Sequence, residues 1–212
     1  MRQPIIENEK YNRRGFIGTL GLGATTLVLP RYGLAHPQVM EERNINHIGP
    51  MTGFTPQIGT LISMLDWVSN TVIGYHKKLS IEQLDHLYDK DANSIGALML
   101  HLAATEVIYQ DITFRNLNDF SAENKIKWNV AMELGENARK QIKGNPLSYY
   151  KEAIDEVRAA TKAEMGKRND DWLLSGETKD WDWNNYCKWF HVTEHYANHR
   201  GQMTWIAKRI PK

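Results

Sequence analysis

Apolar side chains recur every three or four residues along four stretches of the chain, which is the spacing of one face of a helix. The four stretches are residues 56–78, 94–117, 146–169 and 183–208. No stretch alternates apolar and polar residues in the manner of a half-buried strand. The pattern therefore predicts an all-α protein, and four long helices of this kind are typical of a four-helix bundle.

The connections between these helices carry weaker patterns. Residues 118–145 are long enough to cross the bundle and include an amphipathic segment, so we expect either an excursion from the bundle or an additional helix packed on its outside. Asp182 precedes the last predicted helix and is expected to cap its first turn. His76, near the end of the first helix, is expected at the surface, where it would complement the helix dipole.

The chain begins with a segment that we assign to export rather than to the fold. Arg13 and Arg14 precede an apolar, glycine-rich run at residues 16–29, which is short for a membrane span, and small residues follow at 33–35. Residues 1–35 resemble a twin-arginine export signal, which implies transport of a folded protein to the periplasm or another extracytoplasmic space. A retained anchor and a disordered tail are the alternative interpretations.

After this segment the chain has the composition of one ordinary globular domain. Residues 36–55 contain prolines and glycines but few apolar side chains, which is typical of a linker, so the domain is expected at residues 56–210, with no membrane span in the mature protein. A formal net charge of +1 gives no reason to propose a nucleic-acid partner. The single cysteine, Cys187, excludes an intramolecular disulfide and is interpreted as structural.

Candidate chemistry is concentrated on the last predicted helix, where His191, His195 and His199 follow one another at four-residue intervals. Residues four apart lie on one helix face, one turn from each other. The apolar residues that share an arc with His195 and His199 are Val192, Met203, Ile206 and Ile210. Both histidines are therefore predicted to point into the core. They could hold one metal ion, or each could be a core histidine with an ordinary hydrogen bond, and the spacing leaves both interpretations open.

A third histidine is predicted to face the core from a helix that is remote in sequence. His101 lies on the same face of the predicted helix 94–117 as Leu98 and Thr105. A buried imidazole needs partners for its ring nitrogens. The two helices together therefore supply three imidazoles that are candidates for one buried site.

Two short motifs resemble the DinB-like family, whose members are also described as YfiT-like metalloenzymes. The first is SIGALMLHLA at residues 94–103, a turn of small residues that leads into a helix with one histidine. The second is HYANHRGQM at residues 195–203, which opens the second half of the last helix. The resemblance covers about residues 56–210 and is specific only at these two motifs. Residues 118–145 have no counterpart in it.

Carried over position by position, the resemblance makes His101, His195 and His199 the ligands of a divalent metal, zinc or nickel. Three histidines with one open position would describe a catalytic site rather than a structural one. Gln202 and Asn198 flank the same face and are expected to orient the imidazoles.

His191 and Arg200 are less well defined by the resemblance. His191 has no counterpart in the ligand set, and we interpret it as an ordinary core or surface residue, as a hydrogen-bond partner of bound water or substrate, or as a fourth ligand. Arg200 belongs to the family motif, where it would bind substrate or form an interhelical ion pair.

Three functions remain open. Relatives of known activity include transferases that use low-molecular-weight thiols, so the resemblance implies metal-activated addition of a thiol to an electrophile. Metal-dependent hydrolysis would need a general base, for which Glu194 and His191 are the candidates on this helix. The alternative is an exported, non-catalytic bundle that binds a metal or small ligand. Export counts against thiol transfer, because such thiols are mainly cytoplasmic. The small-molecule substrate is not defined, and a homodimer is expected only because dimers are common in the family.

Overall fold

A computed structural model describes residues 44–211, and within that range the protein is entirely helical. Its four long helices are α1 (Pro56–His76), α3 (Ile95–Phe114), α6 (Leu147–Met165) and α8 (Asn185–Ala207). Each lies within a few residues of its predicted range, so the all-α bundle is confirmed. The predicted export signal, residues 1–35, lies outside the described residues.

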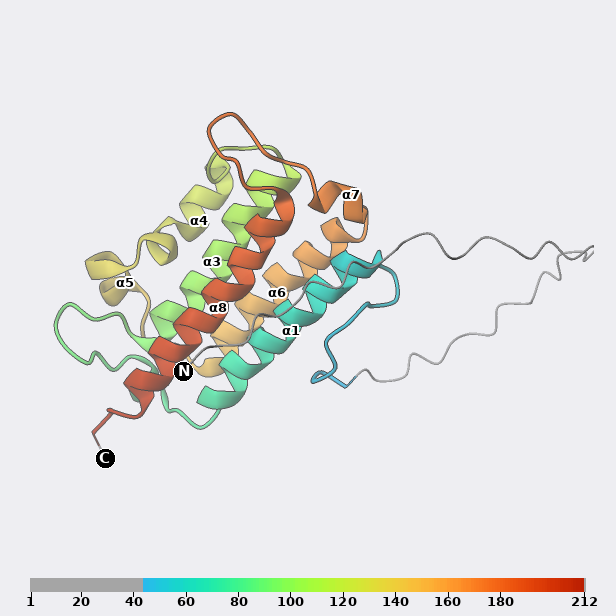
Figure 1. Cartoon of the computed structure of the whole chain (residues 1–212). Coiled ribbons are helices and arrows are strands. Elements are labelled where there is room, and N and C mark those ends of the chain that lie inside the picture. The colour runs from blue at the N-terminus through green and yellow to red at the C-terminus, as the bar shows by residue number, and fades with distance from the viewer. Residues whose placement is uncertain (1–43, 212) are drawn as a thin grey trace, which may run out of the picture. The chain divides into compact units, whose positions relative to one another are not determined.

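Each long helix of the bundle packs against two others (Figure 1). Helix α3 lies against α6 and α8, and α1 lies against the same two helices from the other side. The side chains between them are apolar and almost fully buried, and they include Ile62, Leu65, Leu102, Ile154, Val192 and Met203. This core holds α3 and α8 side by side, which brings together the two histidine-bearing faces.

The close contact between α3 and α6 depends on a glycine at the start of α3. A Cβ atom added at Gly96 would lie 2.4 Å from the hydroxyl oxygen of Tyr150, a residue of α6. Contacts under 3.0 Å are essentially absent from real structures, so a larger residue would require the Tyr150 side chain, or the helix that carries it, to shift. The small residue in the first motif therefore has a packing role, which is to let Tyr150 cross the first turn of α3.

The remaining described helices are short and lie in the connections. They are α2 (Ile81–Leu84), α4 (Ala122–Glu133), α5 (Gly135–Gln141) and α7 (Asp170–Leu173). Residues 118–145 therefore form two helices, where one was expected, and α4 packs against α3 (Figure 1).

A buried carboxylate fixes α4 to the end of α3. Asp111 of α3 is 1% exposed and accepts hydrogen bonds from the backbone N–H of Ser121 and from Nδ2 of Asn124, both at 2.8 Å. The segment is therefore tied to the bundle before α4 begins, and it belongs to the packed structure rather than to a loose excursion.

The helix caps differ in part from those predicted. Asn184, not Asp182, caps α8, because its Oδ1 accepts from the backbone N–H of Cys187 at 2.8 Å. At the start of α1 the cap comes from α7, where the Asp170 carboxylate accepts from the backbone N–H groups of Gln57 and Ile58. A cap supplied by a distant helix satisfies the same free N–H groups as a local one, but it leaves no local sequence pattern.

The prediction that His76 lies at the surface is wrong. Its side chain is buried at the end of α1 with 1% exposure, and its Nδ1–H donates to the carbonyl of Val72 at 2.7 Å. Helix α8 packs along α1 and covers this position. Burial lowers the pKa of His76 below its usual value, so the ring is neutral at pH 7 and does not serve the helix dipole.

Within residues 44–211, none of the helices combines the length and the apolar character needed to cross a membrane.

Candidate metal centre

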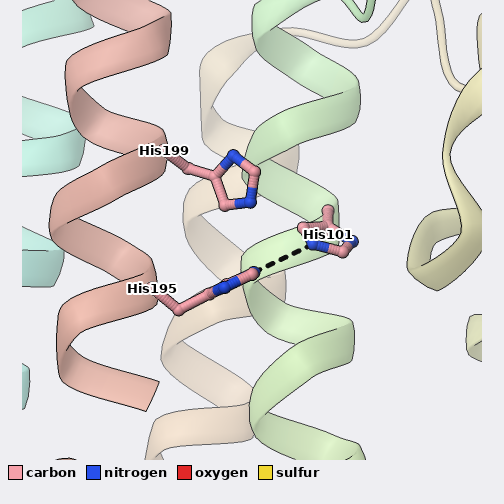
Figure 2. Close-up of side chains that lie close together, drawn as sticks. All are labelled: His101, His195 and His199. Carbon is pink, nitrogen blue, oxygen red and sulfur yellow. Dashed lines mark hydrogen bonds between the residues drawn. The ribbon is translucent and has the colours of Figure 1, made fainter. Parts of the chain in front are cut away.

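Three histidines from two helices meet between α3 and α8 (Figure 2). His101 comes from α3, and His195 and His199 come from successive turns of α8. One ring nitrogen of each lies within 4.8 Å of those of the other two, and the Nε2 atoms of His101 and His195 are 2.9 Å apart. The structure thus brings together the three residues that the sequence singled out.

Hydrogen bonds at the outer nitrogens of two rings fix which nitrogen faces the cluster. Nδ1–H of His101 donates to the backbone carbonyl of Ala131 at 3.0 Å, and Nδ1–H of His199 donates to Oε1 of Gln202 at 2.9 Å. A carbonyl oxygen can only accept, so in each neutral ring the hydrogen lies on Nδ1 and Nε2 keeps its lone pair. Ala131 and Gln202 therefore hold two imidazoles in the tautomer that a metal requires.

Burial keeps all three rings neutral. His101 and His199 are each 8% exposed, and His195 is half-buried. Burial, together with the neighbouring His199, lowers the pKa of His101 to about 4 and that of His195 to about 3. Burial also lowers the pKa of His199, while the hydrogen bond to Gln202 opposes the change. Near pH 7 the cluster therefore carries no charge and presents nitrogen lone pairs.

The donor set fits a divalent metal by chemistry and by spacing. Neutral imidazole is a ligand of zinc and nickel, and bonds of about 2.0–2.1 Å to a tetrahedral zinc place ligand nitrogens roughly 3.3 Å apart. The three nitrogens lie within 4.8 Å of one another, and one pair is 2.9 Å apart, so small side-chain movements would bring them to that separation. Nε2–H of His195 donates to the Nε2 lone pair of His101. The hydrogen of His195 must therefore move to its Nδ1 before its Nε2 can act as a ligand, and a neutral imidazole ring allows this change of tautomer.

His191 lies next to the cluster rather than in it. Its ring centroid is 5.6 Å from that of His195, and its Nδ1 shares a hydrogen bond of 2.9 Å with the hydroxyl of Tyr109. Burial raises the pKa of Tyr109 to about 12, so the hydroxyl keeps its proton at neutral pH. Glu194, the other candidate general base, is exposed. Of the two, His191 is the residue placed to interact with a molecule at the histidines.

Arg200 faces away from the histidines, toward α1. Its Nη1 donates to the hydroxyl of Thr71 at 2.8 Å, and its guanidinium lies over the rings of Trp67 and Tyr75. One of the two interpretations of Arg200 was an interhelical ion pair. The contact of Arg200 with α1 is interhelical, but it consists of a hydrogen bond and stacking on aromatic rings rather than an ion pair. Asn198 is exposed on α8, and of the two amides expected to orient the imidazoles, Gln202 is the one that bonds to a histidine.

Two residues that form hydrogen bonds with these histidines were not identified from the sequence. The carbonyl of Ala131 belongs to α4, in the segment that had no counterpart in the resemblance, and a backbone carbonyl carries no residue-type signal. Tyr109 lies two turns beyond His101 on α3 and is 7% exposed. Its position on the apolar face of the predicted helix was a usable signal, because a buried tyrosine hydroxyl requires a partner.

The family of the chain follows from its match to a known family model. A model described as mycothiol-S-transferase matches residues 60–210, which include all three histidines and the whole α4–α5 segment. The chain belongs to the mycothiol-S-transferase family. That family is part of the DinB-like superfamily, so the resemblance seen in the two motifs is confirmed. No curated protein matches the chain.

The mycothiol-S-transferase match spans residues 118–145, so α4 and α5 lie within the family domain. This agrees with the hydrogen bond from His101 to Ala131, which makes α4 a structural support of the histidine cluster.

Proposed function

We propose that this protein is a divalent-metal-dependent transferase that adds a thiol to an electrophilic small molecule. His101, His195 and His199 would hold the metal, with zinc and nickel as the metals that suit three imidazoles. Held by three neutral ligands, the cation would keep its full charge and lower the pKa of a bound thiol. The proposal is supported by the family match and by the convergence of three neutral imidazoles.

The observation that carries the proposal is the pair of hydrogen bonds at Nδ1 of His101 and His199, the ring nitrogens that face away from the cluster. Ala131 and Gln202 accept from Nδ1–H of His101 and His199, so both Nε2 lone pairs face the cluster, where Nε2 of His101 lies 2.9 Å from Nε2 of His195. A cluster whose outer nitrogens are held by hydrogen bonds and whose Nε2 atoms converge is suited to bind a cation.

Metal content tests the first step. The full chain, purified without a metal-affinity tag, is expected to contain about one zinc or nickel ion, and His101→Ala and His199→Ala are expected to lose it. His86→Ala, a matched change outside the cluster, should keep the metal. If the purified chain holds no metal and takes none up when zinc or nickel is supplied, the proposed centre is wrong.

A thiol requirement separates transfer from hydrolysis. The metal-loaded chain should consume an electrophile only when a low-molecular-weight thiol is present, and thiol and electrophile should disappear in equal amounts. Hydrolysis is favoured by one observation, the place of His191 beside His195, where it could accept a proton from water. Turnover without thiol that is lost in His191→Phe would replace transfer by hydrolysis. Metal binding with no turnover of either kind would support the non-catalytic alternative.

Export stays a prediction, and it bears on which thiol is available. Cell fractionation of the wild type beside a variant with Arg13→Lys and Arg14→Lys tests it, since a twin-arginine signal requires both arginines. Wild type outside the cytoplasm and variant retained inside would support export. An equal cytoplasmic distribution of both proteins would remove the objection to cytoplasmic thiols.

A further inference from the structure

A pocket of about 580 Å³ adjoins the histidine cluster at the C-terminal half of α8. Its lining residues come from α8, from the start of α3 and from the connection that precedes α3. Gln202 belongs both to its lining and to the cluster, because its Oε1 accepts the hydrogen bond from His199. A molecule in this pocket would therefore lie one side chain away from the candidate metal ligands.

Two aromatic rings in the lining stay unusually exposed. Tyr88 is 50% exposed and Trp205 is 43% exposed, and their rings pack edge to face with centroids 4.6 Å apart. The guanidinium of Arg209 lies 4.0 Å from the centre of the Trp205 ring and holds it in place from outside the lining. Aromatic rings that are fixed yet exposed offer apolar area and ring edges to a ligand without a large loss of side-chain entropy.

The space in front of these rings exists because α8 has a glycine there. A Cβ atom added at Gly201 would have no neighbour within 4 Å, so a larger side chain at this position would project into open space rather than into the bundle. Gly201 also lines the pocket. It is therefore the position at which the pocket can be filled without disturbing the core.

The charges of the lining favour an uncharged occupant. Asp89 is the one charged side chain among the lining residues, and no lysine or arginine accompanies it. A ligand carboxylate would meet this like charge and lose water, and the nearby Arg209 guanidinium, which packs on the Trp205 ring, is not among the lining residues that could pair with it. The polar groups that remain are amides, including those of Asn93 and Gln202, which suit hydroxyl, carbonyl or amide groups of a neutral molecule.

We propose that this pocket binds the uncharged aromatic or apolar body of the electrophilic substrate, beside the histidine cluster. The assignment of the occupant as substrate rests on the proposed function, whereas the ligand class rests on the pocket alone. The carboxylates of an anionic thiol or an anionic electrophile would be excluded from this pocket.

Direct binding tests the inference without any turnover. The full chain, loaded with zinc, is titrated against naphthylmethanol, naphthylmethylamine and naphthoate, three probes that share one ring system and differ in charge, with ligand-detected NMR as the readout. The neutral probe is expected to bind about tenfold more tightly than the anion, which corresponds to about 1.4 kcal/mol. Gly201→Leu should weaken binding of the neutral probe at least about tenfold, and Trp205→Ala should weaken it to a smaller extent.

Gly74→Leu is the matched control, because Gly74 is also an exposed helical glycine with open space around its added Cβ. It should leave probe binding unchanged. Equal affinities in wild type and Gly201→Leu, or naphthoate binding as tight as naphthylmethanol, would overturn the inference. If the chain binds no metal but the order of probes and the effect of Gly201→Leu hold, the proposed transferase fails while the pocket and its ligand class stand.

Discussion

Two polar clusters join the helices of this bundle, and they differ in where their hydrogen-bonding groups find partners. The first is the histidine cluster of His101, His195 and His199, between α3 and α8. The second lies five residues further along α3, at Glu106, whose carboxylate is 0% exposed. We call it the Glu106 cluster, and its other members are Arg158, Thr161 and Tyr196, which come from α6 and α8.

The Glu106 cluster is closed within the protein. Its carboxylate accepts from Nε and Nη2 of Arg158 at 2.8 and 2.9 Å, from the hydroxyl of Thr161 at 2.6 Å and from the hydroxyl of Tyr196 at 3.1 Å. Burial alone would raise the pKa of Glu106, but Arg158 and these hydrogen bonds lower it below its usual value. The carboxylate is therefore charged at neutral pH, and its charge and its acceptor sites are matched by the protein.

The histidine cluster is uncharged, and its hydrogen bonds to the surrounding protein are made by the outer ring nitrogens. Hydrogen bonds to Ala131 and Gln202 occupy the outer nitrogens, while the inner nitrogens face one another. Two polar clusters that share helix α3 thus have different uses. The closed one joins three helices, and the one with inner lone pairs is suited to receive a ligand.

The largest expected effect is on the closed cluster. Arg158→Leu leaves the Glu106 carboxylate buried without its cation, and removal of one partner of such a pair costs about 3–5 kcal/mol in the free energy of unfolding. Urea unfolding measures it. Glu106→Leu combined with Arg158→Leu should recover part of the loss, because no buried charge is left. Lys167→Leu, which breaks an exposed pair with Glu164, should cost less than about 1 kcal/mol. If Arg158→Leu costs no more than this control, the cluster does not hold the bundle together.

Metal should stabilise the histidine cluster and leave the Glu106 cluster unaffected. With zinc at about one hundred times its dissociation constant, the free energy of unfolding is expected to rise by about 2.7 kcal/mol, and a chelator should reverse the rise. His199→Ala should show no rise, although its metal-free form stays folded because the core and the Glu106 cluster are intact. Urea unfolding with and without zinc measures both. A metal-free wild type that is unfolded would show that the two clusters are not independent.

A smaller effect is expected from the residue that holds His199. Gln202→Ala removes the acceptor of Nδ1–H, and loss of such a supporting bond typically lowers metal affinity about tenfold to a hundredfold. This corresponds to about 1.4–2.7 kcal/mol. Competition with a chromogenic chelator measures the affinity. Asn198→Ala, the same type of change one residue before His199, should have no effect. Equal losses in both variants would mean that the change acts through α8 as a whole.

Much of this arrangement could be predicted from the sequence, because it depends on helix periodicity. The apolar arcs predicted that His101, His195 and His199 point into the core, and His101 and His199 are buried there while His195 is half-buried beside them. Ala131 could not be predicted, because its contribution is a backbone carbonyl on a segment whose packing depends on tertiary contacts such as those of Asp111. The same limit applies to the cap that Asp170 supplies to α1 from a distant helix.

His76 was misjudged for a related reason. Its position at the end of a helix suggested the surface, but the length of α8 decides whether that end is covered, and the first helix contains no information about it. The polar members of the Glu106 cluster were also not recognised from the sequence. A buried glutamate and a buried arginine 52 residues apart look like two ordinary surface charges until α3 and α6 are placed side by side.

His76 also supplies the smallest predicted effect, which tests why the cluster histidines are neutral. Its pKa in the folded state is lowered from 6.5 by burial. As pH falls below about 6.5, the unfolded chain binds a proton at this position more readily than the folded chain does, so stability falls with pH. One such group contributes at most about 1.4 kcal/mol per pH unit. The cluster histidines change the stability of the metal-free chain with pH in the same direction. Measurements on the wild type alone therefore cannot isolate the contribution of His76.

His76→Leu separates this contribution, because it removes one titrating ring that has no part in the histidine cluster. In the presence of a chelator, the free energy of unfolding is measured from about pH 7.5 to about pH 5.5 for both proteins, and the slopes are compared rather than the absolute values. The variant should lose less stability on acidification, by up to about 1 kcal/mol over the first pH unit below 6.5. Identical slopes would mean that burial at this level leaves a histidine free to protonate. The neutral state of His101 and His195 would then have to come from their mutual repulsion and not from the bundle around them.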